Sequence, residues 1–381
     1  MDFSFSTVGK IVFGLGRIRD IGAEVSALGS RVLLVTGRGF LRRTGRLVEI
    51  EESMRSRGVV VTVFEQVPPE PYLGIVESGI AECRGHDCDV IVAVGGGSAV
   101  DVGKTIAALV GASGDVREYL HGREIERKGL PFVAVPTTSG SGAEVTPNAV
   151  LIDQERGVKS SIRSVYMLAD VAIIDPELTL SLPPDVTAYS GMDALSQAME
   201  ALVSQGATPL TDALASDAAA RLIGGLVSAY EDGNNLESRT EAALGSLMGG
   251  IAFANARLGL VHGLAHPLGV ITGLPHGLIC GLLLPIVVRF NAEVSGEKYA
   301  QIARRTGVAG SETSTDEAVG ALVDVLDRMN AEMKINDRRS EIRIERRTWP
   351  AVVSQTMASG STKSNPRSVT AEDVERLLAR P

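Results

Sequence analysis

The first half of the chain alternates short apolar runs with segments of helical periodicity. Several of these runs are rich in β-branched residues and apolar on both faces, as expected for parallel strands covered by helices. The runs span residues 10–13, 31–36, 59–64, 89–94 and 132–135, and a last one begins near Val171. This alternation predicts a doubly wound α/β domain, whose ligands bind outside the carboxyl ends of the strands.

The second half has apolar residues at intervals of three and four with charged residues between them, which is the pattern of amphipathic helices. The predicted helices span residues 211–230, 239–265, 277–291, 316–333 and 371–378. We therefore expect an α/β domain over residues 1–184 and an all-helical domain over residues 185–381, with a cofactor cleft between them.

Composition and charge argue against several classes of partner. The 381 residues are 44% hydrophobic and 22% charged, which is ordinary for a globular enzyme, and the net charge of −9 argues against a nucleic-acid partner. The first residues do not form a secretory signal, and the longest apolar run, 278–288, is too short to cross a bilayer. Three scattered cysteines fit a reducing compartment. We expect a cytoplasmic protein with no membrane partner.

Two short motifs suggest chemistry that their context does not support. The segment from Cys83 to Cys88, Cys-Arg-Gly-His-Asp-Cys, resembles a zinc knot but lacks a nearby fourth ligand, so we interpret it as a helix end. Gly14-Leu-Gly16 lacks the third glycine of a dinucleotide fingerprint, and no acidic residue ends the next strand. We interpret it as a tight turn in a leading hairpin.

A stronger cofactor signal follows the run at 89–94. Three glycines, Gly95 to Gly97, precede Ser98, Asp101 and Lys104 at the start of a predicted helix. Bare backbone N–H groups and a helix N-terminus can approach a pyrophosphate closely. The next strand is followed by the hydroxyl-rich segment 136–144, which is either a second nucleotide-binding loop or an ordinary loop.

The segment 258–277 contains three of the five histidines of the chain. His262 and His266 are four residues apart, so a helix projects both from one face, and His276 follows Pro275, where a new helix is expected to begin. Neutral imidazole is a common metal ligand and proton carrier. Three histidines together favour a metal or proton-transfer site over buried structural histidines.

Together these motifs resemble the iron-containing (group III) alcohol dehydrogenase family, over nearly the whole chain. The resemblance implies a Rossmann-like domain with a helical domain (the dehydroquinate synthase-like fold), and an NAD(P)-dependent alcohol dehydrogenase or aldehyde reductase acting on a small alcohol or aldehyde. We also expect a homodimer. The matching motifs are Gly-Gly-Gly-Ser-x-x-Asp-x-x-Lys at 95–104, Pro-Thr-Thr-x-Gly-x-Gly-x-Glu at 136–144, Gly191-Met-Asp193-Ala-Leu, the histidine segment and Asn365-Pro-Arg.

The resemblance also assigns roles to individual residues. A divalent metal, Fe or Zn, would be held by Asp193, His262 and His276 and would polarise the substrate oxygen, while His266 exchanges a proton with solvent. Phe253 would line the substrate pocket. The cofactor, NADP or NAD, would be bound by Gly96, Gly97, Ser98 and Asp101 at the pyrophosphate and nicotinamide half, by Thr137, Thr138 and Ser141 at the nucleotide, and by Lys159 on the nicotinamide ribose side.

The chain departs from the family at Gln197, where a fourth metal ligand is normally histidine. Asp193 and Gln197 are four residues apart and leave one helix face together. The amide oxygen of glutamine is neutral and hard, and therefore a poor ligand for a borderline divalent ion. The metal is in doubt for this reason, although one carboxylate and two imidazoles still form a facial set, as in the glycerol dehydrogenase branch.

Three other positions also differ from the family pattern. Glu70 stands where asparagine is usual, and Arg257 where glycine is common. On a continuous helix Arg257 would share a face with Phe253 and reach the substrate, and the alternative is an ordinary solvent-facing arginine. Gly37 stands where NAD-restricted members have aspartate. Without that carboxylate, and with Arg38 and Arg42 nearby, we predict that NADPH is accepted at least as well as NADH.

Three other functions remain open. A metal-independent enzyme similar to maleylacetate reductases would polarise the carbonyl with histidines alone. A lyase similar to dehydroquinate synthase shares the fold, NAD and a zinc ion, but its basic phosphate-binding residues are not evident in this chain. A nucleotide-binding protein that has lost catalysis through Gln197 is the third alternative.

Overall fold

The computed structural model describes residues 2–379 and divides the chain into two compact units. The α/β unit contains Ser6–Thr138 and Gly142–Thr179, and the helical unit contains Leu180 onward together with the segment up to Phe5 and Ser139–Ser141. The main change from one unit to the other falls at Leu180, in the proline-marked connection that follows the last strand.

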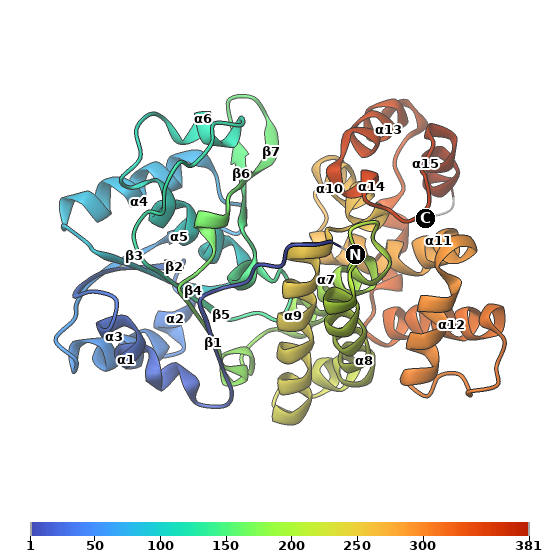
Figure 1. Ribbon diagram of the computed structural model, residues 1–381, viewed down its shortest axis with the longest axis horizontal. Coiled ribbons are helices and arrows are strands. Elements are labelled where there is room, and N and C mark those ends of the chain that lie inside the picture. Colours follow the sequence, from blue (N-terminus) through green and yellow to red (C-terminus); the bar gives the residue numbers. More distant parts are fainter. Residues whose placement is uncertain (1, 380–381) are drawn as a thin grey trace. The chain divides into compact units, whose positions relative to one another are not determined.

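The α/β unit is built on a six-stranded sheet whose neighbouring strands are all parallel, in the order β1-β8-β5-β4-β2-β3 (Figure 1). The central strands β4 and β5 are buried along their whole length, which explains why their sequences are apolar on both faces. The strands are β1 (Lys10–Phe13), β2 (Arg31–Gly37), β3 (Val60–Val67), β4 (Val90–Gly95), β5 (Phe132–Pro136) and β8 (Val171–Ile174).

Helices cover both faces of this sheet. Val32 and Leu34 of β2 lie in one core cluster with Ile21 of α1 and Ile50 of α3, whereas Gly79 of α4 faces Ile106 of α5. Figure 1 shows α1 and α3 on one side of the strands and α4 and α5 on the other. The helices are α1 (Ile21–Ser26), α2 (Phe40–Arg43), α3 (Arg46–Arg55), α4 (Leu73–Gly85), α5 (Gly97–Leu109) and α6 (Val116–Leu120).

The order of the strands reverses between β2 and β4, because the chain runs outward from β2 to β3 and then returns to the other side of β2. Doubly wound sheets bind ligands at such a switch point, outside the carboxyl ends of the strands. The loops that leave this point begin at Arg38 after β2 and at Gly96 after β4. Both loops carry residues that the sequence analysis assigned to the cofactor.

The predicted leading hairpin at Gly14-Leu-Gly16 is wrong. β1 runs parallel to β8, whereas a hairpin requires antiparallel strands. The glycines form a tight turn into a short 3₁₀ helix instead, and the Asp175 carboxylate accepts hydrogen bonds from the Gly16 and Ile18 backbone N–H groups at 3.1 and 2.9 Å.

A true hairpin lies elsewhere and was missed. β6 (Asn148–Asp153) pairs with β7 (Val158–Arg163) in an antiparallel ribbon separate from the main sheet. β7 reads Val-Lys-Ser-Ser-Ile-Arg, in which only two residues are apolar, and four of its six residues are exposed. Its apolar pattern was therefore too weak to predict a strand.

The helical unit packs around α7 and the long helix α11, whose buried residues belong to one hydrophobic cluster (Figure 1). The glycine at 277 is required there, because a Cβ atom at that position would lie 1.9 Å from the Tyr189 carbonyl oxygen on α7. The helices are α7 (Pro184–Val203), α8 (Pro209–Glu231), α9 (Leu236–Ala256), α10 (Leu260–Thr272), α11 (His276–Arg305), α12 (Thr315–Glu332), α13 (Trp349–Ala358), α14 (Gly360–Lys363) and α15 (Ala371–Leu378).

The single helix predicted over 239–265 is two helices. α9 ends at Ala256, the chain bends by 100° and α10 begins at Leu260. Arg257 has φ of 71°, which is incompatible with a right-handed helix. The apolar periodicity continues across the break, so it does not mark the bend.

One helix of the described residues, α11, has the length and apolar composition of a membrane span. Two thirds of its most apolar window, 67%, is buried inside the protein, as in the core helix of a globular fold.

Candidate metal centre and cofactor loop

One face of α7 carries three buried polar side chains, Asp193, Gln197 and Glu200. Their spacing of four and three residues places them one above the other on the helix. The Asp193 pKa is lowered even though burial opposes ionisation, because the imidazoles of His262, His276 and His266 stabilise the carboxylate. The site therefore favours the charged form of the Asp193 carboxylate despite its burial.

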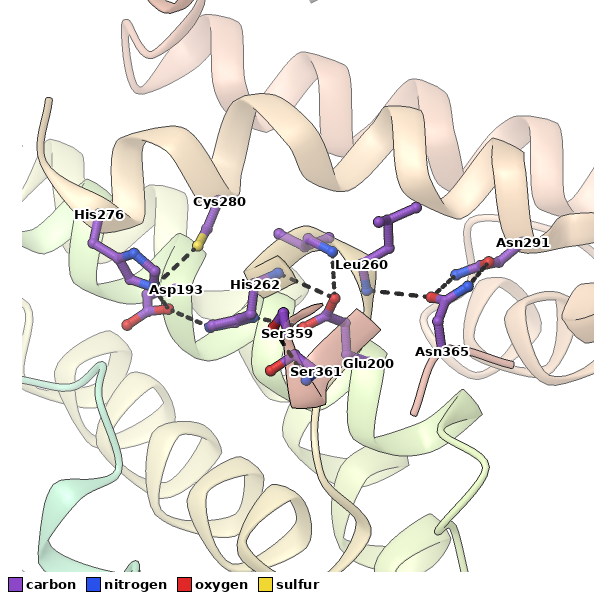
Figure 2. A network of polar contacts seen from close by, with 11 residues as sticks. Asp193, Glu200, Leu260, His262, His276, Cys280, Asn291, Ser359, Ser361 and Asn365 are labelled. Carbon is purple, nitrogen blue, oxygen red and sulfur yellow. Dashed lines mark hydrogen bonds and ion pairs between the residues drawn. The ribbon is translucent and has the colours of Figure 1, made fainter. Parts of the chain in front are cut away.

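His262 lies between two of these carboxylates. Its Nδ1 is 2.6 Å from Glu200 Oε2, and its Nε2 is 3.2 Å from Asp193 Oδ1 (Figure 2). Burial by itself lowers the pKa of His262, but the two carboxylates outweigh it and raise the pKa to about 10. Without another cation the ring therefore carries the positive charge itself.

The start of α10 is fixed by hydrogen bonds from the rest of the unit. Glu200 Oε1 accepts the Val261 N–H at 2.6 Å, and Asn365 Oδ1 accepts the Leu260 N–H at 3.2 Å. Asn365 and Asn291 of α11 exchange a pair of side-chain hydrogen bonds at 2.8 and 3.0 Å (Figure 2). The Asn365-Pro-Arg motif thus ties α10 to α11 and sets the position of His262.

His276, the first residue of α11, completes the group. Its Nε2 lies 3.7 Å from Asp193 Oδ1 and 3.5 Å from the sulfur of Cys280, one turn later on the same helix (Figure 2). The close approach of Gly277 to α7 brings this end of α11 beside Asp193. Ligand atoms of Asp193, His262, His276 and Cys280 all lie within 4.8 Å of one another.

Gln197 lies one helical turn from Asp193 and is 4% exposed. Its Oε1 is buried without a hydrogen-bond partner among the described residues. Leaving a buried carbonyl oxygen without a hydrogen bond costs free energy. A hydrogen-bond donor or a cation bound beside Gln197 would remove this cost.

The loop after β4 supplies the predicted cofactor site in the α/β unit. A Cβ atom on Gly96 would lie 3.6 Å from the Thr138 side chain, and one on Gly95 would lie 3.9 Å from the Gly37 backbone nitrogen. The Thr137 N–H donates to the Gly95 carbonyl at 2.9 Å. The ends of β2, β4 and β5 therefore present Gly37, the glycine loop and two threonines together.

Buried polar groups hold the helix that follows this loop. The Lys104 ammonium donates to the carbonyls of Ala143, Thr146 and Asn148 at 2.6 to 2.8 Å. One turn earlier, the Asp101 carboxylate accepts the Val150 N–H at 3.0 Å. Both residues of the motif thus fix the segment 143–150 against α5, and Asp101 is only partly buried.

The comparisons with known proteins identify the family. Residues 9–176 match iron-containing alcohol dehydrogenase, and residues 187–381 match the C-terminal part of the Fe-containing alcohol dehydrogenase family. The chain belongs to the iron-containing alcohol dehydrogenase family.

Individual relatives span almost the whole chain. It is 33% identical to the NAD-dependent methanol dehydrogenase of Bacillus methanolicus, over 96% of each protein. It is 35% identical to the 1,3-propanediol dehydrogenase of Klebsiella pneumoniae, over 96% of this chain and 95% of that protein. The crystal structure of a 1,3-propanediol oxidoreductase superposes with a TM-score of 0.96 and 35% identity, over 100% of both chains.

Membership of the iron-containing alcohol dehydrogenase family confirms the predicted fold and the predicted function. The parallel-sheet domain followed by a helical region is the dehydroquinate synthase-like fold. The chain is an oxidoreductase that acts on alcohols and aldehydes with a nicotinamide cofactor.

The geometry brings most of the predicted metal and histidine residues together. His266 lies outside the group of four but its ring stacks on that of His276, with centroids 5.1 Å apart. His266 is exposed and His276 is partly exposed, whereas His262 is buried, so His266 is the most solvent-accessible of the three. This arrangement suits the proton exchange that was predicted for it.

The reason given for placing Arg257 beside Phe253 does not hold. Phe253 is a partly buried residue of α9 that packs against the helical core, but α9 ends before Arg257. Arg257 is exposed, with φ of 71° and ψ of 178°. The two side chains do not share a helical face, and glycine is common here because this backbone conformation suits glycine.

The predicted cofactor residues differ in the hydrogen bonds and ion pairs that they form. The Lys159 ammonium pairs with Glu70 at 2.6 Å, so the departure at Glu70 supplies a partner for the predicted ribose-binding lysine. Arg42 pairs with Glu65 at 2.8 Å, whereas Arg38 is exposed and donates to the Gln66 carbonyl at 3.3 Å. Ser98 donates to the Pro69 carbonyl, and Ser141 groups with the helical unit.

Two residues of the candidate site were missed from the sequence. Glu200 lies seven residues after Asp193 on the face of α7 that carries the predicted ligands, and this helical spacing could have identified it. Cys280 lies four residues after His276 and shares its helical face in the same way. It was considered only for disulfide bonding.

Proposed function

We propose that the protein is an NAD(P)-dependent alcohol dehydrogenase that works mainly as an aldehyde reductase on small substrates. A divalent ion, Fe or Zn, is held by Asp193, His262 and His276. The observation that carries this proposal is the convergence of two imidazole nitrogens on one oxygen, Asp193 Oδ1, at 3.2 and 3.7 Å. We further propose a cytoplasmic homodimer.

The spacing of these atoms suits a small divalent ion. Two ligands at ordinary zinc–oxygen and zinc–nitrogen bond lengths in a tetrahedral arrangement lie about 3.3 Å apart. The two observed oxygen–nitrogen separations, 3.2 and 3.7 Å, bracket this value. The unpaired Gln197 oxygen on the same face of α7 also suits a nearby cation. The residues therefore fit a metal ion.

The bound ion supplies a Lewis acid for the substrate oxygen. Glu200 holds Nδ1 of His262, so that Nε2 faces Asp193 and keeps one orientation. His266 exchanges the alcohol proton with solvent from the exposed side of His276. The loop after β4 would hold the pyrophosphate of the nicotinamide cofactor, which would supply the hydride that reduces an aldehyde.

For the cofactor, we propose that NADPH is used at least as well as NADH. Gly37 ends β2 without the carboxylate that would repel a 2′-phosphate at this position. The exposed Arg38 beside it is available to pair with that phosphate.

Two measurements test the proposal. Nicotinamide absorbance is followed with a panel of small neutral and acidic aldehydes, using NADH and NADPH in parallel. The enzyme is then chelated exhaustively, analysed for residual metal and reloaded separately with Fe(II), Zn(II), Mn(II), Co(II) or Ni(II). We expect turnover to fall on chelation and to return with metal. Full turnover by protein free of metal would support the maleylacetate reductase-like alternative, and binding of cofactor without turnover would support a non-catalytic role.

A further inference from the structure

Cys280 lies beside the candidate metal centre and is a possible ligand that the sequence analysis did not consider. It is 0% exposed and lies one turn after His276 on α11. Residues four apart on a helix project from the same face, so the thiol and the imidazole are directed to one place. Figure 2 shows the Cys280 sulfur directed toward Asp193 and His276.

The sulfur lies where a fourth ligand is needed. The separation of Cys280 Sγ from His276 Nε2 is 3.5 Å. A nitrogen and a sulfur bound to one zinc ion in a tetrahedral arrangement are about 3.6 Å apart. The same sulfur is within 4.8 Å of the ligand atoms of Asp193 and His262. All four donors can therefore contact a single ion with small adjustments.

Gln197 makes a thiolate ligand more important. The chain has a neutral amide on α7, at Gln197, where the family resemblance implies an imidazole, and a neutral oxygen donor binds a borderline ion weakly. A thiolate is both charged and soft, and it is among the strongest ligands for zinc. The Cys280 thiolate on α11 would thus replace the weak Gln197 ligand on α7.

Resting on the proposed metal-dependent function, we infer that Cys280 is the fourth protein ligand. The site is then Asp193, His262, His276 and Cys280, a donor set whose soft thiolate favours Zn(II). On binding, the metal–sulfur bond forms, the S–H bond breaks and one proton is released to solvent.

Thiol chemistry is compatible with this assignment. A thiol that coordinates a divalent ion is deprotonated outright, so the ligand would be a thiolate.

A cobalt spectrum tests the inference without relying on activity. The purified protein is stripped of metal, loaded with Co(II) and scanned for thiolate-to-cobalt charge-transfer absorption in the near ultraviolet. We expect the band in the wild type and in Cys83→Ser, whose thiol is buried in the α/β unit, and its loss in Cys280→Ser. If the wild type binds cobalt without showing the band, the inference is overturned. This outcome is measured on the wild type and does not depend on whether a variant folds.

Zinc affinity gives a second measurement. Loss of a group that only orients a ligand costs 10–100-fold in affinity, so we expect Cys280→Ser to weaken zinc binding by more than about 100-fold. Adding Gln197→His to Cys280→Ser should restore most of the affinity, because the imidazole supplies a fourth donor from α7. Unchanged zinc affinity in Cys280→Ser overturns the assignment of Cys280 while leaving the metal-dependent function intact. A wild type that binds neither Zn(II) nor Co(II) overturns the assignment of Cys280, and one that binds no divalent ion overturns the metal-dependent function as well.

Discussion

Glu200 Oε2 lies 2.6 Å from Nδ1 of His262, on the side of the ring opposite to Asp193. Glu200 also accepts the Val261 N–H, so one carboxylate fixes both the ring and the backbone beside it. A carboxylate behind a metal-binding histidine fixes its tautomer and raises its basicity. Glu200 is thus a positioning residue for the candidate metal centre.

Glu200→Gln should lower metal affinity by about 10–100-fold, the usual effect of losing such a partner. The amide can still accept the Val261 N–H, so the fold should persist. The measurement is competition with a chelator of known affinity. The exposed Glu231 at the end of α8 provides the control, because Glu231→Gln leaves the site intact. Equal affinity in the two variants would mean that Glu200 serves only the backbone of α10.

The backbone conformation at Arg257 predicts that replacing this residue by glycine stabilises the helical unit. Its φ of 71° and ψ of 178° lie in a region that is essentially reserved for glycine, at a cost of about 1–3 kcal/mol for other residues. Arg257→Gly should therefore raise the free energy of unfolding by about that amount. Urea unfolding followed by fluorescence of Trp349, the single tryptophan and a residue of this unit, reports the change.

The control for Arg257→Gly has the opposite sign. Ala254→Gly, inside α9, should destabilise the unit by about 0.5–1 kcal/mol. Because Arg257 is exposed and does not share a helical face with Phe253, Arg257→Gly should change kcat/KM equally for an acidic and a neutral aldehyde. A selective loss on the acidic aldehyde would instead show that the guanidinium contacts substrate.

The break between α9 and α10 shows where the sequence is a poor guide. Apolar residues continue at helical intervals across residues 257–259, because both helices are buried in one core. A periodicity of burial does not report a change in direction. The strands of the main sheet were predictable for the opposite reason, since runs that are apolar on both faces occur in few other settings.

The candidate site shows the same contrast. His262 and His276 were noticed in the sequence because they lie in one short segment rich in histidine, and Asp193 because it lies in a motif that resembles the family. Cys280 and Glu200 lie at helical spacings from two of these residues, but their role depends on a contact between α7, α10 and α11 that no local pattern contains. The close approach at Gly277 that creates this contact is visible only in the fold.

Cofactor choice can be tested at the end of β2. Gly37→Asp should reduce kcat/KM for NADPH and leave that for NADH largely intact, because the new carboxylate repels the 2′-phosphate and can accept hydrogen bonds from the free ribose hydroxyls. Arg38→Ala should weaken the binding of NADPH by roughly 1.5–3 kcal/mol, the usual strength of a charge-assisted hydrogen bond. The measurement is the ratio of kcat/KM for the two cofactors.

Arg42→Ala provides the matched control, because Arg42 is already paired with Glu65. It should leave the NADPH-to-NADH ratio unchanged. A wild type that rejects NADPH, or a ratio that does not respond to Gly37→Asp, would contradict the proposed cofactor preference.

Glu144 predicts a pH dependence of stability in the α/β unit. It is 5% exposed, and burial raises its pKa from 4.5 to about 7. Between these values the unfolded chain has released the proton that the folded protein retains, so the free energy of unfolding falls as pH rises from about 4.5 to 7 and stays low above it. The difference of pKa corresponds to about 3 kcal/mol.

Glu144→Gln removes this titration and keeps the shape of the side chain. Across the same pH window, the free energy of unfolding of the variant should therefore rise relative to that of the wild type, by up to about 3 kcal/mol. Urea unfolding followed by far-ultraviolet circular dichroism at several pH values gives the comparison. Glu126→Gln, at an exposed position of the same unit, should follow the wild type. Parallel pH profiles for Glu144→Gln and the wild type would show that Glu144 is ionised in the folded protein throughout this range, and that its neighbour Lys104 compensates the charge despite being buried.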